Sequence, residues 1–269
     1  MFIKFSHDGK VVTLIVYVDD IVLTGDDTVE MARVKEKLAV DFESKDMRFM
    51  RYFIDTHMDL NAKLWGEVSV VSQFMHSLFE EYLEAVYRIQ RYLKGNPGKG
   101  LFFKKTSERN VSIFTDADWA GSVTNRRLTS GYCTYVWGKL VTWRSKKQGV
   151  AARSSAEAEF RAMSQGICKG LWILRVLEEL KMKIELPLKL FSDSKAAINI
   201  AHNPVQHDKT KHIEIDRYFI KEKLYAGLIC LPFVTSSQQT TDILTKSLEK
   251  LTFEHLIDKL GMINIYAPT

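Results

Sequence analysis

Residues 111–121 read VSIFTDADWAG, a stretch of β-branched and aromatic residues that ends in acidic side chains. This pattern predicts a β-strand with Asp116 at its C-terminal end. Open α/β sheets place their ligand sites at the carboxyl ends of strands, so the same stretch marks a candidate site.

Regular elements follow this strand as far as residue 260. Residues 130–145, SGYCTYVWGKLVTWRS, predict two strands with Gly138 at the turn between them. A long helix is expected from Ser154 to Leu180, because a serine cap and an acidic first turn mark its start. The order β-β-β-α-β-α-α-β-α predicts an α/β (mixed α+β) fold in which helices pack on a five-stranded mixed sheet. The later elements are strands at 188–193 and 229–234 and helices at 194–203, 211–227 and 240–260.

Four acids fall at the ends of these strands or on first helical turns. Gathered together, four carboxylates would repel one another and take up protons unless cations neutralised them. Magnesium binds few carboxylates and leaves positions for water and phosphate oxygens. Two such ions about 4 Å apart activate a water and stabilise a leaving oxygen, so the pattern indicates phosphodiester hydrolysis. The four acids are Asp116, Glu159, Asp193 and Asp242.

These acids also have a purely structural reading. Asp and Glu near a helix N-terminus commonly cap the helix, and this applies to Asp118, Glu157 and Asp242. The functional reading therefore depends on the set rather than on any single carboxylate.

Seven stretches, in their order and spacing, resemble the RNase H domain of copia-type LTR retrotransposon Pol polyproteins. The resemblance implies an RNase H-like fold that hydrolyses the RNA strand of an RNA–DNA hybrid, with two Mg²⁺ ions as cofactors and Mn²⁺ as a substitute. It also assigns Asp116, Glu159, Asp193 and Asp242 as the catalytic metal ligands. The stretches are TDADWAG (115–121), SGYCTYV (130–136), WRSKKQ (143–148), SSAEAEFRAM (154–163), FSDSKAAI (191–198), TKHIEID (210–216) and DILTK (242–246).

Two of these assignments leave alternatives open. Glu157 and Glu159 lie two residues apart and point to different faces of the helix, so the choice of Glu159 follows the family pattern alone. Asp216 competes with Asp242 for the fourth ligand position. His212 either helps to order the site or is an ordinary helix histidine.

The N-terminal residues also resemble part of a Pol polyprotein. Residues 11–20 read VVTLIVYVDD and are followed by IVLTG, which predicts a β-hairpin with acids at its tip. YVDD resembles the palm hairpin of a reverse transcriptase, which implies a vestigial polymerase metal site at Asp19 and Asp20. Only 16 residues precede Tyr17, so polymerisation by this chain alone is not expected.

Three domains are predicted along the chain. Residues 1–109 are expected to be a truncated reverse transcriptase palm and connection remnant, with helices at 28–42 and 79–94. Residues 110–250 are expected to form the RNase H-like domain, and 251–269 a C-terminal tail.

Basic and polar residues near the acid-bearing elements predict contacts to nucleic acid. Lysine and arginine contacts to phosphates give binding that is independent of sequence and weakens with salt. Discrimination of RNA from DNA requires contacts to the 2′-hydroxyl, for which serines beside the acids are candidates. Trp119 and Trp143 either stack on sugar or base faces or belong to the core. The predicted contact residues are Arg126, Arg127, Arg144, Lys146, Lys147, Ser155, Ser194 and Lys211.

Composition is that of a soluble globular protein. The 269 residues are 46% hydrophobic and 26% charged, and the net charge of +5 is compatible with nucleic-acid binding. No apolar run approaches the roughly 18 residues of a membrane span, and the first ten residues show no secretory signal. An intracellular protein without membrane contact is therefore expected.

Three hypotheses for the function remain, and none of them identifies a protein partner. The first is an active ribonuclease H that cuts the RNA strand of an RNA–DNA hybrid, which the intact set of acids favours. The second is an inactive retroelement relic or nucleic-acid-binding remnant, which the shortened polymerase part favours. The third is an adaptor that uses the fold only for protein contacts.

Overall fold

In the computed structural model the chain divides into two compact units. The first comprises Met1–Met50 with Val176–Met182, and the second comprises Arg51–Arg175 with Lys183–Thr269. None of the described helices is long and apolar enough to cross a membrane. The described residues are 2–5, 8–17, 20–41, 52–53, 83–84, 87, 99–102, 106–118, 129–148, 152, 154–203, 211–246 and 248–264.

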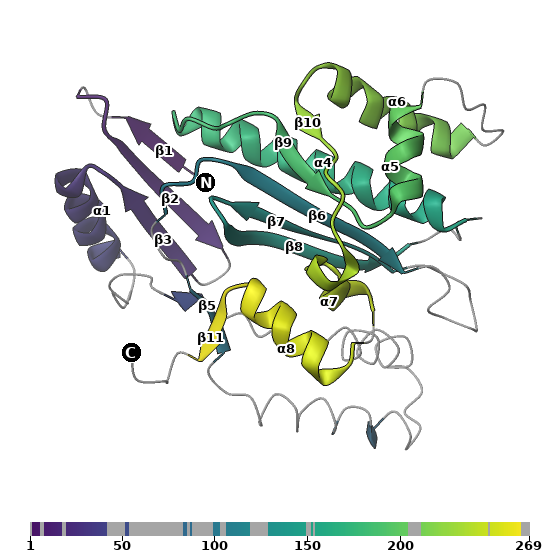
Figure 1. The fold of residues 1–269 in the computed structure, drawn as a ribbon. Coiled ribbons are helices and arrows are strands. Elements are labelled where there is room, and N and C mark those ends of the chain that lie inside the picture. The colour runs from purple at the N-terminus through teal and green to yellow at the C-terminus, as the bar shows by residue number, and fades with distance from the viewer. Residues whose placement is uncertain are drawn as a thin grey trace. The chain divides into compact units, whose positions relative to one another are not determined.

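The first unit is a small antiparallel sheet with one helix (Figure 1). The predicted hairpin is confirmed as β2 (Val11–Tyr17) and β3 (Asp20–Gly25), and β1 (Phe2–Phe5) adds a third strand that the sequence analysis did not predict. Helix α1 (Thr28–Asp41) lies where a helix was expected. Its first turn is capped, because the Glu30 N–H donates to the Asp27 carboxylate over 3.0 Å.

The second unit is built on a five-stranded mixed sheet in the order β10-β9-β6-β7-β8. Strand β6 pairs antiparallel with β7 and parallel with β9, while β7–β8 is antiparallel and β9–β10 is parallel. The predicted five-stranded mixed sheet flanked by helices is therefore confirmed. The strands are β6 (Val111–Asp118), β7 (Thr129–Val136), β8 (Lys139–Lys147), β9 (Leu188–Phe191) and β10 (Ile229–Cys230).

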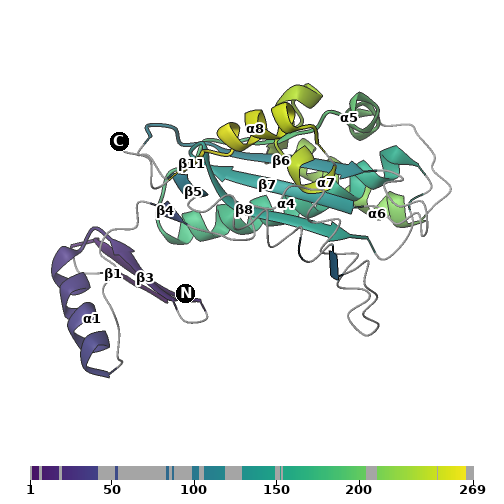
Figure 2. The same cartoon turned by 90° about the horizontal axis from the view of Figure 1, so that it is seen from below.

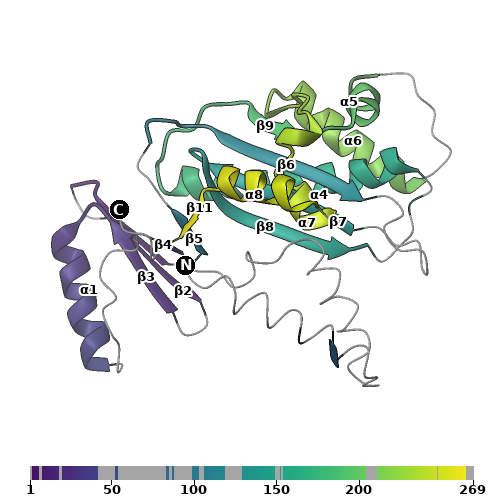
Figure 3. The same ribbon diagram turned by 60° about the horizontal axis from the view of Figure 1, so that its bottom comes forward.

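Helices cover both faces of this sheet (Figure 2). Helix α4 (Ser155–Glu179) lies on one face, and α7 (Asp242–Thr245) and α8 (Lys250–Lys259) lie on the other. The view in Figure 3 shows α7 and α8 in front of the sheet and α4 behind it. The other described helices of this unit are α5 (Lys195–His202), α6 (Lys211–Tyr225) and the 3₁₀ turn η1 (Ser236–Gln238).

Helix α4 packs very closely on β6. A methyl group added at Gly166 would lie 2.5 Å from the Thr115 side chain, and one added at Gly170 would overlap Ile113. Ala158 and Ala162 continue this small-residue ridge at four-residue spacing, and both are buried. The ridge brings the helix backbone close to the strand that carries Asp116.

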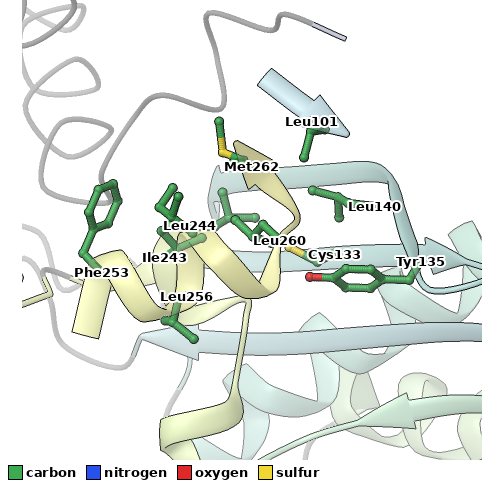
Figure 4. Close-up of a cluster of buried hydrophobic side chains, with 11 residues drawn as sticks. Leu101, Cys133, Tyr135, Leu140, Ile243, Leu244, Phe253, Leu256, Leu260 and Met262 are labelled. Atoms are coloured by element: carbon green, nitrogen blue, oxygen red, sulfur yellow. The ribbon is translucent and has the colours of Figure 1, made fainter. Parts of the chain in front are cut away.

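The predicted terminal helix at 240–260 is wrong in one respect, because it is two helices. Helix α7 ends at Thr245, its C-cap residue Lys246 has an extended backbone with φ −121° and ψ 151°, and α8 starts after Glu249. All four residues of α7 are buried. The break lets α7 and α8 bury their own apolar sides in the same cluster, which a straight helix along one axis cannot do (Figure 4).

The stretch 251–269, predicted as a tail, contains packed structure in its described part. Phe253, Leu256, Leu260 and Met262 are buried in the cluster that Figure 4 shows, together with Leu101. Strand β11 (Met262–Asn264) pairs with β5 (Lys99–Phe102), which also pairs with β4 (Tyr52–Phe53) in a separate three-stranded sheet. The helix expected at 79–94 falls mostly outside the described residues.

The packing of α4 on β6 predicts that Gly166→Ala destabilises the protein. Alanine normally favours a helix interior by about 0.5–1 kcal/mol over glycine. Here the added methyl group overpacks Thr115, which costs about 1–3 kcal/mol and lowers the melting temperature by several degrees. Thermal unfolding followed by circular dichroism measures the change. The exposed Gln165→Ala on the same helix is the control, and a rise in melting temperature for Gly166→Ala would contradict the packing.

Candidate functional site

Three predicted acids meet at one edge of the five-stranded sheet. Asp116 lies near the C-terminal end of β6, Asp193 follows its parallel neighbour β9, and Glu159 lies in the first turns of α4. Their carboxylate oxygens lie within 4.8 Å of one another. Only 1% of Asp116 and 6% of Glu159 is exposed. The close packing of α4 on β6 therefore brings together side chains that lie far apart in the sequence.

Hydrogen bonds position these carboxylates. The Ala117 N–H donates to Glu159 Oε1 over 3.4 Å, whereas Glu159 Oε2 is buried and has no hydrogen-bond partner among the described residues. The Thr245 hydroxyl donates to Asp116 Oδ2, and the Ser236 hydroxyl donates to Asp193 Oδ2 over 3.1 Å. The unsatisfied oxygen of Glu159 points to a missing positive partner, because a buried carboxylate oxygen without one is costly.

Lys246 supplies one positive charge to the site. Its ammonium nitrogen lies 3.0 Å from Asp116 Oδ1, 2.9 Å from Asp242 Oδ1 and 3.8 Å from Asp193 Oδ2. Asp242 thus joins the other acids through this shared lysine. Lys246 was not among the predicted site residues, although its spacing of four residues from Asp242 in DILTK is typical of a helical ion pair.

Burial opposes the ionisation of these acids. Burial, followed by the charges of Asp116 and Asp193, raises the pKa of Glu159 to about 9. Burial and the charge of Asp116 raise the pKa of Asp242 to about 7 even though Lys246 opposes the shift. Burial also raises the pKa of Asp116 above its usual range. Without a metal ion, the cluster therefore keeps protons at a pH at which exposed carboxyl groups would have lost them.

The two competing acids, Glu157 and Asp216, lie elsewhere. Glu157 forms an ion pair of 2.7 Å with Arg161 on its own helix. The carboxyl group of Asp216 on α6 is influenced by Ser164, Arg161 and Glu157 of α4 rather than by the three clustered acids. Glu159 and Asp242 are therefore the candidates that the fold brings to Asp116.

Two of the basic candidates lie on β8 at the level of Asp116. The strand register aligns Asp116 with Gly131 of β7, and Gly131 with Ser145 of β8. The Ser145 hydroxyl donates to the Leu244 carbonyl of α7 over 2.7 Å, so the flanking Arg144 and Lys146 point to the opposite face. Both are exposed. Two strand spacings separate this position from Asp116, or about 10 Å.

Only some of the other predicted nucleic-acid contact residues lie in the described part of the chain. Ser194 lies next to Asp193 and caps α5, because its hydroxyl oxygen accepts from the Ala197 N–H over 3.2 Å. Ser155 begins α4 and is exposed, and Lys147 ends β8. Trp143 is half-buried and packs against the hydrophobic cluster of Figure 4. Arg126, Arg127, Trp119 and Asp19, as well as the side chains of Asp20, Lys211 and His212, lie outside the described residues.

Because ionisation of Glu159 is unfavourable, we predict that Glu159→Gln stabilises the metal-free protein at high pH. The folded pKa of about 9 lies above the ordinary 4.5, so the contribution of Glu159 to stability is greatest below pH 4.5 and declines as the pH rises toward 9. At pH 8 the variant should gain at least about 1 kcal/mol, or roughly 2–4 °C in melting temperature.

Thermal unfolding in EDTA at pH 5 and pH 8 checks this. The rise in melting temperature of Glu159→Gln over the wild type should be smaller at pH 5, where the Glu159 carboxyl group of the wild type is protonated. The exposed Glu254→Gln on α8 is the control. An equal effect at both pH values would contradict the assigned ionisation.

Comparisons with known proteins give the family. No protein-family model matches the chain. The retrovirus-related Pol polyprotein from transposon RE1 of Arabidopsis thaliana is 35% identical over 216 residues, which cover 80% of this chain and 14% of that protein. The corresponding polyprotein from transposon TNT 1-94 of Nicotiana tabacum is 33% identical over 195 residues, or 72% of this chain and 14% of that protein.

Similar solved structures include RNase H domains. The N-terminal RNase H domain of a Mycobacterium tuberculosis protein is 16% identical with a TM-score of 0.38, covering 56% of this chain and 98% of that one. LC11-RNase H1 in complex with an RNA/DNA hybrid is 13% identical with a TM-score of 0.37, covering 51% of this chain and 94% of that one. The sequence relatives carry the assignment: although it spans only 14% of the length of RE1 or TNT 1-94, the chain belongs to the retrovirus-related Pol polyproteins of transposons.

Proposed function

We propose that the second unit is a ribonuclease H-type endonuclease that hydrolyses the RNA strand of RNA–DNA hybrids with the help of two divalent metal ions. The observation that carries this proposal is the convergence of the Asp116, Glu159 and Asp193 carboxylates within 4.8 Å at the end of two parallel strands. Membership of the Pol polyproteins supports the same reading, since the motifs around these acids resemble the RNase H domain of that family.

The donor set fits divalent metal ions. Magnesium and manganese prefer carboxylate oxygens and water, and the site offers carboxylates with one buried oxygen of Glu159 unsatisfied. Asp116, Glu159 and Asp193 would hold the first ion, and Asp116 with Asp242 would contribute to the second. When bound, such ions activate a water and stabilise the leaving oxygen of the phosphodiester.

The surrounding residues hold the carboxylates and reach the substrate. The Ala117 N–H and the Thr245 and Ser236 hydroxyls fix the carboxylate orientations, so little reorganisation is needed when cations and phosphate arrive. Arg144 and Lys146 are exposed on β8, with side chains on the face of the sheet opposite to Asp116 and α7, and are our candidates for contacts to phosphates of the hybrid away from the cut. Ser194, beside Asp193, is our candidate for a contact to the ribose 2′-hydroxyl.

Loss of a metal ligand should abolish cleavage. We predict that Asp193→Asn reduces cleavage of a labelled RNA–DNA hybrid by the full chain by more than about 100-fold, because even residues that only support metal ligands change activity by 10–100-fold. The assay compares Mg²⁺, Mn²⁺ and EDTA. The exposed Asp258→Asn on α8 is the matched control and should leave cleavage unchanged.

The outcomes of this assay separate the hypotheses. Metal-dependent cutting of the RNA strand that Asp193→Asn abolishes supports the proposal. A folded chain that binds the hybrid but does not cut it would instead indicate an inactive relic with a binding role. A chain that does neither would favour an adaptor.

Basic residues of β8 should determine part of the affinity for the hybrid. We predict that the double variant Arg144→Gln and Lys146→Gln weakens binding and reduces the slope of log K against log salt by up to about 2, or somewhat less than one per phosphate contact. Fluorescence anisotropy at several salt concentrations measures both quantities. The same charge change at Lys250 and Lys259 of α8 is the control, and an equal loss there would argue against a specific contact surface on β8.

A further inference from the structure

Lys246 occupies the position in which a cation is expected. Its ammonium group lies 3.0 Å from Asp116 Oδ1, 2.9 Å from Asp242 Oδ1 and 3.8 Å from Asp193 Oδ2. The Thr245 hydroxyl donates to the other oxygen of Asp116. Both oxygens of Asp116 are therefore in contact with groups of the chain itself, and a metal ion that binds Oδ1 would meet the ammonium group of Lys246.

The lysine is the group that can leave. The backbone of α7 is fixed, because all four of its residues are buried and Ser145 holds the Leu244 carbonyl over 2.7 Å. Lys246 lies at the C-terminal cap of this helix, where the backbone becomes extended, and 33% of its side chain is exposed. A lysine has a long flexible stem, so its ammonium group can move to solvent while the helix stays in place.

The ammonium ion and a divalent ion are mutually exclusive at Asp116 Oδ1. A magnesium ion binds a carboxylate oxygen at about 2.1 Å, whereas an ammonium nitrogen lies at about 2.8 Å. Two cations so close together on one oxygen would repel each other strongly inside a site that is largely closed to water.

We propose that Lys246 is a built-in counter-ion of the metal-free site, which holds Asp116, Asp193 and Asp242 in place and withdraws when a divalent ion binds. This inference rests on the proposed metal-dependent function. Lys246 is thus a positioning residue that keeps mutually repelling carboxylates near their working geometry, and its displacement reduces the affinity for the first ion.

The withdrawal can be observed in the unmodified chain by acetylation of lysines. In EDTA, Lys246 should react slowly with an acetylating reagent, because its amine is held by carboxylates. Saturating Mg²⁺ should increase its rate of modification several-fold, as measured by mass spectrometry of peptides. Lys250 is an internal control, since its side chain is 86% exposed and its rate should not depend on metal.

A neutral variant tests the competition. Lys246→Met should bind Mn²⁺ about tenfold more tightly than the wild type in isothermal titration calorimetry, which corresponds to the loss of one charged hydrogen bond. In EDTA at neutral pH its melting temperature should fall by at least about 2 °C. Lys250→Met is the matched control for the change in charge, and Lys246→Arg should retain the metal-free stability of the wild type.

The outcomes of these experiments distinguish a failure of the counter-ion inference from a failure of the proposed metal-dependent function. If Mn²⁺ and Mg²⁺ bind to the wild type but neither the modification rate of Lys246 nor the Mn²⁺ affinity of Lys246→Met changes, the counter-ion inference is overturned and the proposed function stands. Mn²⁺ binding by Lys246→Met that is equal to or weaker than that of the wild type also overturns the counter-ion inference. If neither chain binds these ions, the metal chemistry and the inference fall together.

Discussion

The close contact between α4 and β6 is the constraint on which the site depends. Gly166 and Gly170 leave no room for a methyl group against Thr115 and Ile113, so the helix backbone lies almost directly on the strand. A helix of this length is stiff, and fixing its middle against β6 also fixes the height and rotation of its first turn. Glu159 is thereby held beside Asp116, with its Oε1 on the Ala117 N–H. The two glycines of α4 thus determine the position of Glu159.

This arrangement gathers charge that the fold alone stabilises poorly. Burial raises the pKa values of Asp116, Glu159 and Asp242, because water cannot solvate the ionised carboxylates there. The Lys246 ammonium group, one backbone N–H and two hydroxyl groups partly compensate for this missing solvation. A cluster selected for stability alone would replace such acids with apolar residues. The presence of these acids, together with an unsatisfied oxygen of Glu159, is therefore better explained by a cationic ligand than by packing.

The sequence predicted the long elements and the acids but not the contacts that join them. The strands and helices around Asp116, Glu159 and Asp193 have clear periodicity, so their order and the mixed sheet followed directly. The break after Thr245 was missed because 240–260 has a continuous helical pattern, and only burial against the sheet favours two helices. Lys246 was missed because two of its ion-pair partners, Asp116 and Asp193, are distant from it in sequence. Strand β1 is only four residues long and was not predicted, although Asp8 and Gly9 between it and β2 form a typical turn signal.

The short helix α7 completes the site from the opposite face of the sheet. Within its one turn and cap it supplies Asp242, Thr245 and Lys246, all directed at acids of the site. Such a helix is not stable alone, because so few residues form few internal hydrogen bonds. Its position comes from tertiary contacts: Gly131 admits Thr241 and Thr245 at close range, and the Gln239 amide donates to the Thr115 carbonyl over 2.9 Å. Because β6 and α7 are more than a hundred residues apart, the site forms only when the whole second unit has folded around the sheet.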